Sequence, residues 1–194
     1  MAHILPHWNW PERVGEVTPV HVFTSGNEAE LFLNGKSLGK REKGIYEYRL
    51  RWDDVIYEPG ELKAVAYKDG NVWAQELVKT TSVPVKLQAT ADRTEITADG
   101  KDLSFITVQI SDTEGLMVPR SNNLIQFSIE GPGEIVATDN GDPTNMVSFT
   151  SKEREAFNGL CLVIVRSVAG KSGTVKVKVH SSGLKETQVE LQCK

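Results

Sequence analysis

The chain has 194 residues, which suits one or two domains, and its net charge at pH 7 is −4. Hydrophobic residues make up 39% and charged residues 25% of the sequence, the balance of an ordinary globular protein. There is no basic footprint for nucleic acid, and no apolar run approaches the roughly 20 residues that span a bilayer. We therefore expect neither nucleic acid nor a membrane among the partners of this chain.

The first motif is an aromatic cluster, Pro6-His7-Trp8-Asn9-Trp10, which precedes the first clear strand. Pro6 and Pro11 favour an extended backbone on either side of it. Two interpretations of Trp8 and Trp10 are open. They anchor the segment against this domain or a neighbouring one, which is the favoured interpretation, or they stack on the C–H faces of a sugar, as exposed indole rings do.

Short runs of alternating polar and apolar residues follow, separated by Gly, Asn, Asp and Pro, and we find no convincing helix. Asn34-Gly35 and Asp69-Gly70 each stand between two such runs. Both pairs tolerate the positive φ values that a type I′ hairpin turn requires. We predict two hairpins, in which residues 31–34 pair with 37–40 and residues 61–68 pair with 71–79.

Between these hairpins, residues 46–52 alternate in the manner of a half-buried strand. The residues predicted to face inward are Tyr46, Tyr48, Leu50 and Trp52. We therefore place Trp52 in the core. Trp73 alternates with Gln75 and Leu77 on a later strand and is predicted to be half-buried. Together with Trp8 and Trp10, Trp73 is a candidate for contact with carbohydrate or with another domain.

The connector Thr80-Thr81-Ser82-Val83-Pro84 separates one set of strands from the next. Proline fixes φ, lacks a donor and restricts the residue before it, so it suits a short and stiff link. We predict two domains, 1–82 and 83–194. A domain of about 80 residues buries a smaller fraction of its surface than one of about 110, so the first is expected to be closer to marginal stability.

The second half continues the strand pattern. Runs of alternating residues cover 125–129 and 175–179, and 160–165 is a continuous apolar run typical of a buried strand. Cys161 lies in this run, and Cys193 shares its alternation phase with Val189 and Leu191. Two cysteines do not make a disulfide scaffold, so we interpret both as free, buried and apolar in character.

No residue pattern points to catalysis. Retaining glycosidases hold two carboxylates about 5–5.5 Å apart, and neighbours such as Asp53-Asp54 face opposite sides of a strand. There is also no nucleophile-elbow pattern for a Ser–His–Asp triad. Residues 139–143 (DNGDP) resemble part of a calcium loop but lack the spacing of an EF-hand, and Asp, Asn and Gly also form turns. We predict a turn there, and no metal or cofactor.

Five segments resemble, in order, the β-domains that follow the catalytic barrel in β-galactosidase-like enzymes of glycoside hydrolase family 2. They are residues 3–10 (HILPHWNW), 31–39 (LFLNGKSLG), 57–64 (YEPGELKA), 131–143 (GPGEIVATDNGDP) and 154–160 (REAFNGL). The first three resemble the domain directly after the barrel, and the last two resemble the terminal immunoglobulin-like domain. The resemblance implies catalytic glutamates on a barrel of roughly 250 residues, for which this chain has no room.

The sequence thus predicts an all-β protein of two consecutive antiparallel β-sandwiches of immunoglobulin or fibronectin type III character. The resemblance implies a non-catalytic, C-terminal accessory region that braces or spaces the barrel or supports oligomerisation, with the barrel and the other parent domains as partners. A carbohydrate-binding module, with polysaccharide as ligand, and an adhesion or protein-interaction module are the alternatives. The parent is expected to be periplasmic or secreted and bacterial, although residues 1–4 predict no signal peptide in this chain.

Overall fold

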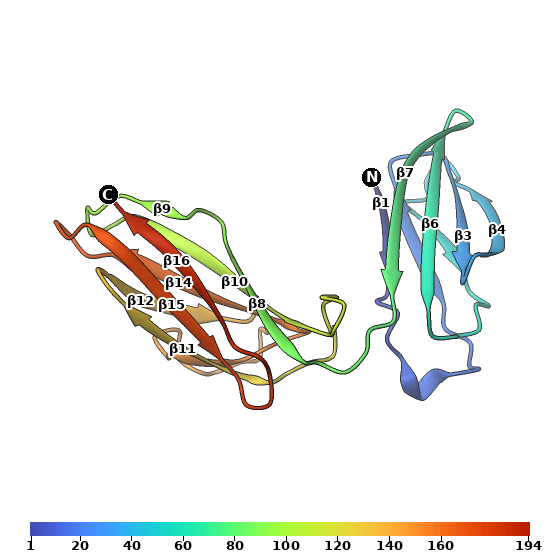
Figure 1. Ribbon diagram of the computed structural model, residues 1–194. Coiled ribbons are helices and arrows are strands. Elements are labelled where there is room, and N and C mark those ends of the chain that lie inside the picture. Colours follow the sequence, from blue (N-terminus) through green and yellow to red (C-terminus); the bar gives the residue numbers. More distant parts are fainter. The chain divides into compact units, whose positions relative to one another are not determined.

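The computed structural model describes all residues, 1–194, and they form two compact units, Met1–Thr80 (unit 1) and Thr81–Lys194 (unit 2). Each unit consists of two β-sheets, as Figure 1 shows. The one helical element is a 3₁₀ turn, η1, at Pro11–Arg13. The structure contains no helix with the length and apolar character needed to cross a membrane. The predicted all-β class is therefore confirmed.

Unit 1 contains seven strands in a three-stranded and a four-stranded sheet, ordered β1-β2-β5 and β4-β3-β6-β7. Every pairing in both sheets is antiparallel. The strands are β1 (Ala2–Leu5), β2 (Val20–Thr24), β3 (Glu28–Leu33), β4 (Lys36–Glu42), β5 (Arg49–Trp52), β6 (Glu61–Lys68) and β7 (Asn71–Lys79).

Both predicted hairpins are confirmed. Asn34 and Gly35 have φ values of 49° and 79°, and Asp69 and Gly70 have values of 51° and 79°, so each pair occupies the left-handed region that a type I′ turn needs. β3 pairs with β4 with a register shift between Glu30 and Phe32. β6 pairs with β7 with a second shift between Ala66 and Tyr67. Such bulges increase the local twist of an antiparallel pair.

The core of unit 1 lies between its two sheets. Its buried members are Ile4, Trp8, Val20, Val22, Ala29, Leu31, Leu33, Leu50, Trp52, Val55, Tyr57, Leu62, Ala64 and Ala66. The prediction that Leu50 and Trp52 face inward is confirmed. The same prediction is wrong for Tyr46 and Tyr48, which are 87% and 84% exposed. β5 begins only at Arg49, because residues 49–52 are the ones that pair with β2, and the tyrosines lie in the loop before it.

Unit 2 contains nine strands in a four-stranded and a five-stranded sheet, ordered β12-β14-β10-β8 and β13-β11-β15-β16-β9. The pairings are antiparallel except for the short parallel pair of β16 with β9. The strands are β8 (Lys86–Ala91), β9 (Glu95–Ile96), β10 (Leu103–Ser111), β11 (Leu124–Glu130), β12 (Gly133–Asp139), β13 (Glu153–Glu155), β14 (Leu160–Ser167), β15 (Gly173–His180) and β16 (Thr187–Cys193).

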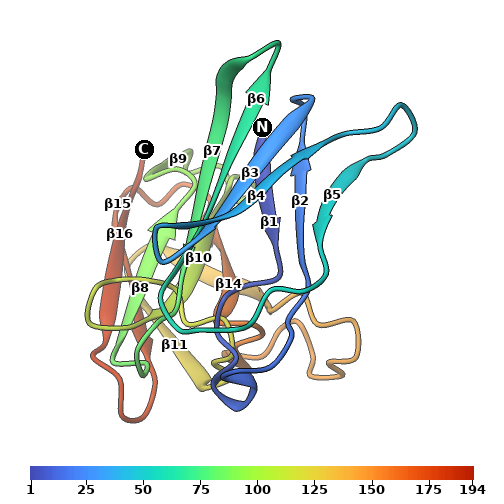
Figure 2. The same ribbon diagram turned by 90° about the vertical axis from the view of Figure 1, so that its right-hand side faces the viewer.

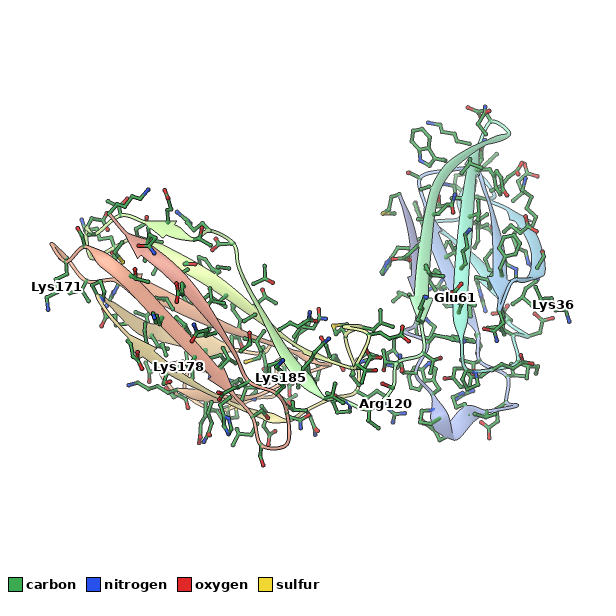
Figure 3. The ribbon with its side chains drawn as sticks, viewed as in Figure 1. Lys36, Glu61, Arg120, Lys171, Lys178 and Lys185 are labelled. Carbon is green, nitrogen blue, oxygen red and sulfur yellow. The ribbon has the colours of Figure 1, made fainter.

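The alternation along β15 shows how this sandwich forms. Val175, Val177 and Val179 are fully buried, while the intervening Lys178 points to solvent (Figure 3) and its Nζ donates to Glu130 Oε1 at 2.6 Å. Cys161 and Cys193 belong to the same core, and both are free and buried as predicted. Burial raises the pKa of the Cys161 thiol to about 12, so this sulfur stays protonated and apolar.

Candidate interaction surfaces

Trp8 lies in the core of unit 1. Its side chain has no exposed surface, its indole N–H donates to the Glu58 carbonyl at 2.8 Å, and its ring lies 4.8 Å from the ring of Tyr57. The Trp8 carbonyl accepts a hydrogen bond from Thr80 Oγ1 at 2.6 Å. This residue therefore anchors the opening segment to the last residue of its own unit, and its indole is closed to sugar.

Trp10 is only partly covered. Its ring stacks on His7, with centroids 4.3 Å apart and planes 19° apart, and its indole N–H donates to the His7 carbonyl at 2.8 Å. Its backbone N–H donates to the hydroxyl of Tyr57 at 3.1 Å. Because His7 occupies one face of the indole, at most the opposite face and the ring edge are available to a partner.

Trp73 stands apart on β7, where half of its surface is exposed. Its indole N–H donates to Ser25 Oγ at 2.9 Å, and Lys68 Nζ lies 4.9 Å from the ring centroid. Trp8 and Trp10 precede β2, so the three tryptophans singled out from the sequence come from two different segments. The structure places one in the core, one against His7 and one at the Ser25 end of β7.

The acidic residues of the DNGDP segment cap turns. Asp139 Oδ1 accepts the N–H groups of Asn140 and Gly141 at 2.7 and 3.3 Å. Asp142 Oδ1 accepts the N–H and the hydroxyl of Thr144 at 2.9 and 2.8 Å. Gly141 has a φ of 74°. These bonds are those of Asx turns, in which a side-chain oxygen satisfies nearby backbone donors.

A shallow hollow of about 470 Å³ opens on unit 1 beside the β3–β4 turn, where Lys36 points outward (Figure 3). Leu33, Val55 and Trp52 form its apolar floor, and Asp54 and Glu58 lie on its rim. Trp52 is 1% exposed, its indole N–H donates to the Gly39 carbonyl at 3.3 Å, and the Arg41 guanidinium lies 5.9 Å from the ring. The indole face is therefore covered and offers no platform for a sugar.

A second surface is the β12–β13 loop of unit 2, residues 140–152. It exposes Met146, Val147 and Phe149, the first of them by 93%. Beneath it lies Arg154, which is 1% exposed although no carboxylate pairs with it. Sequence alternation along the short β13 strand gave no sign of a buried arginine.

Backbone and side-chain oxygen atoms of the surrounding residues accept hydrogen bonds from the Arg154 guanidinium. Its Nη atoms donate to the carbonyl groups of Thr138, Val147 and Ser148 at 2.8–2.9 Å and to Asn145 Oδ1 at 2.9 Å. A guanidinium carries five donors in a fixed plane, so it can hold several loop carbonyls at once. Hydrogen bonds from Arg154 thus hold the backbone of the loop that carries these exposed apolar residues.

A third surface is the β4–β5 loop of unit 1, residues 43–48, which displays Ile45, Tyr46 and Tyr48. Sequence reasoning missed it because the alternation of residues 46–52 suggested one continuous strand. A groove of about 390 Å³ runs beside the loop, lined by Phe23, Tyr46, Glu47, Tyr48, Arg49 and Arg51. Burial lowers the pKa of the neighbouring His21, as do the charges of Arg49 and Arg51.

Comparison with known proteins identifies relatives for both units. The family model described as glycoside hydrolase family 2 C-terminal domain 5 matches residues 87–190, and one described as a domain of unknown function matches residues 15–74. The chain is 37% identical over 191 residues to beta-galactosidase BoGH2A of Bacteroides ovatus, covering 98% of this chain and 22% of that protein. It is 30% identical over 197 residues to a beta-glucuronidase of Formosa agariphila, covering 98% of this chain and 19% of that protein.

Solved structures agree with these sequence matches. A glycosyl hydrolase family 2 member from Bacteroides cellulosilyticus superposes with a TM-score of 0.92 at 36% identity, covering 97% of this chain and 24% of that one. The chain therefore spans about a fifth of the length of the curated relatives named above. The family match covers more than half of its residues, and the chain belongs to the glycoside hydrolase family 2 C-terminal domain 5 family.

Proposed function

We propose that this chain is the non-catalytic C-terminal accessory region of a longer, β-galactosidase-like glycoside hydrolase, and that it braces or spaces the catalytic barrel. The observation that carries the proposal is the display of large apolar side chains on two loops, 43–48 and 140–152. Extended apolar patches on a folded surface mark sites of contact with other polypeptide surfaces. Relatives four to five times longer supply the polypeptide against which such loops would pack.

Three aspartates support the same assignment. Asp139 and Asp142 are engaged in turns, and Asp53 accepts a bond from Arg51 at 2.9 Å. A glycosidase needs one carboxyl group that donates a proton and a second that acts as nucleophile or base across the scissile bond. Carboxylates that cap backbone N–H groups or pair with arginine are occupied with structural tasks.

A carbohydrate-binding module is the second candidate, and half-exposed Trp73 is the observation that favours it. A sugar platform normally presents one aromatic face or a row of them to solvent. Trp8 is buried and Trp10 is covered on one side by His7, so neither extends a row from Trp73. The proposed accessory role therefore has the stronger support.

Two measurements test the proposal. The purified 194-residue chain, assayed on nitrophenyl β-galactosides and β-glucuronides, is expected to give no turnover above a protein-free blank. Deletion of the region from the longer enzyme is expected to lower its thermal stability or change its oligomeric state. Turnover that survives repurification and is abolished by one Asp or Glu substitution would overturn the non-catalytic assignment. Saturable sugar binding that is lost in Trp73→Ala would favour the second candidate.

A further inference from the structure

The β4–β5 loop is the most exposed apolar feature of unit 1. Ile45, Tyr46 and Tyr48 are 93%, 87% and 84% exposed. Figure 2 shows the connection between β4 and β5 extending away from both sheets of the unit. Single exposed apolar side chains are ordinary, but three within four positions on one projecting loop form a patch that water covers at a cost.

Hydrogen bonds fix the shape of this loop. At its base, the N–H of Lys43 donates to the Asn27 carbonyl at 2.7 Å, and Lys43 Nζ donates to the Thr24 carbonyl at 3.2 Å. At its tip, the N–H of Gly44 donates to Glu47 Oε2 at 3.0 Å, and the N–H of Glu47 donates to the Gly44 carbonyl at 3.1 Å. The turn 44–47 is therefore closed on both sides, and Ile45 and Tyr46 lie at its two central positions.

The loop and its flanking strands are also basic. Between Lys40 and Arg51 there are five Lys or Arg residues and two Glu residues, in a chain whose net charge is −4. Lys40 pairs with Glu28, and Arg51 pairs with Asp53 at 2.9 Å. Arg49 lines the groove beside both tyrosines and pairs with no carboxylate within this chain. The surface therefore offers two phenol rings, one aliphatic side chain and one uncommitted guanidinium.

We propose that Ile45, Tyr46, Tyr48 and Arg49 form the docking surface through which unit 1 binds another part of the longer glycoside hydrolase polypeptide, at an apolar patch bordered by carboxylates. Tyr and Arg are the residues that dominate binding energy at protein interfaces. Ile45 gives no ring for a sugar to stack on, which favours a polypeptide occupant. This inference rests on the proposed accessory function and names the surface that performs it.

Hydroxyl-radical footprinting of the full-length enzyme and of the 194-residue chain tests the proposal. Tyr46 and Tyr48 are expected to be oxidised about tenfold more slowly in the full-length enzyme, because residues at the centre of an interface lose nearly all contact with water. Trp73 and Val72, also exposed on unit 1, are internal references whose oxidation rates are expected to match in the two proteins.

Substitutions in the β4–β5 loop provide a second test of the docking surface. The triple variant Ile45→Ser, Tyr46→Ser, Tyr48→Ser is expected to restore fast labelling of residues 43–51 in the full-length enzyme. It should leave the unfolding transition of the isolated 194-residue chain unchanged, since these side chains contribute nothing to its core. Arg49→Glu should act in the same direction and more strongly at low salt, where charge repulsion is least screened. Val72→Thr is the control and should change neither readout.

Four outcomes separate this inference from the proposed function. Equal tyrosine labelling in both proteins would overturn the docking surface while leaving an accessory role that the deletion variant still reveals. A deletion variant with unchanged stability, assembly and activity would overturn the accessory function itself. Protection that rises with the concentration of the 194-residue chain alone would replace the proposed partner by a second copy. Protection that appears only with an acidic oligosaccharide would replace it by a glycan.

Discussion

At the residue scale, Trp52 offers a direct test of core packing in unit 1, since its side chain is 1% exposed. We expect Trp52→Ala to lower the free energy of unfolding of unit 1 by about 3–5 kcal/mol, because a large aromatic side chain is removed from a packed site. Fluorescence-monitored denaturation with urea measures the loss. Trp73→Ala is the matched control, since that ring is half-exposed, and its effect should stay below about 1 kcal/mol. Similar losses of stability in the two variants would contradict the assignment of Trp52 to the core.

Arg154 and Trp8 show which contacts cannot be predicted from sequence. A single arginine between two glutamates has the pattern of a solvent-exposed strand. No local signal indicates that its partners are carbonyl groups of β12 and the β12–β13 loop, the farthest of them 16 residues away. Trp8 lies in the segment between β1 and β2, and its hydrogen-bond partners Glu58 and Thr80 are distant in sequence. In both cases the side chain is buried by contacts with residues outside its own segment, and the alternation of polar and apolar residues does not reveal such contacts.

At the scale of elements, the entry to β6 depends on Gly60. Its φ is 137°, and a Cβ atom at this position would lie 1.9 Å from Asn34 Oδ1. That oxygen accepts the N–H of Glu61 at 2.8 Å, while Asn34 Nδ2 donates to the Pro59 carbonyl at 3.1 Å. Gly60→Ala would therefore break the link between the β3–β4 turn and the start of β6.

We expect Gly60→Ala to destabilise unit 1 by more than about 2 kcal/mol, since backbone strain adds to the loss of hydrogen bonds. Gly70→Ala is the comparison, because Gly70 also has positive φ but nothing lies within 4 Å of the added carbon. Its cost should be about 1 kcal/mol, from strain alone. Thermal denaturation of both variants measures the difference, and equal costs would contradict the proposed role of the Asn34 side chain.

The same elements show how far the fold could be predicted. The hairpins were accessible because Asn-Gly and Asp-Gly turns are local signals that also set the register of the strands they join. The β4–β5 loop could not be predicted, since Tyr46 and Tyr48 continue the alternation of β5 although the pairing with β2 covers only residues 49–52. Alternation indicates which residues share a face when a strand exists, whereas pairing partners decide where the strand begins.

At the scale of the whole molecule, the two units differ in how acid is expected to affect them. His21 in unit 1 has a pKa lowered by burial and by Arg49 and Arg51, so its neutral form is the one that stabilises the fold. That stabilisation is complete above the unfolded pKa near 6.5 and is lost as pH falls through the lower folded value.

In unit 2 the pKa values of several aspartates are lowered. Backbone N–H groups hold down the pKa of Asp92, Asp99 and Asp102. Burial acts to raise the pKa of Asp112, but the N–H groups of Ser82, Leu116 and Glu114 outweigh it and the net change is downward. Stabilisation from these groups is present above the unfolded pKa of 3.8 and is lost as pH falls through the lower folded values.

We therefore expect unit 1 to lose stability first, as pH falls below about 6.5, and unit 2 to lose it only below about pH 4. All four tryptophans lie in unit 1, so tryptophan fluorescence follows that unit while circular dichroism follows both. Thermal melts at stepped pH should give two separate transitions. His21→Gln should remove the pH dependence of the unit 1 transition. Coincident transitions at every pH would show that the units unfold as one and would contradict the predicted division into two domains.

The course of the chain through unit 1 has a mechanical consequence. β1 and β7 run in the same direction: Ser25 Oγ binds the amino group of Met1 and the indole of Trp73 near their starts, and Thr80 Oγ1 binds the Trp8 carbonyl near their ends. β7 has nine residues and so spans about 30 Å. Tension applied between the start of β1 and the end of β7 acts along the strands. Such tension would load the four residue pairs of β1 with β2 in shear, so that they separate together instead of peeling apart one by one.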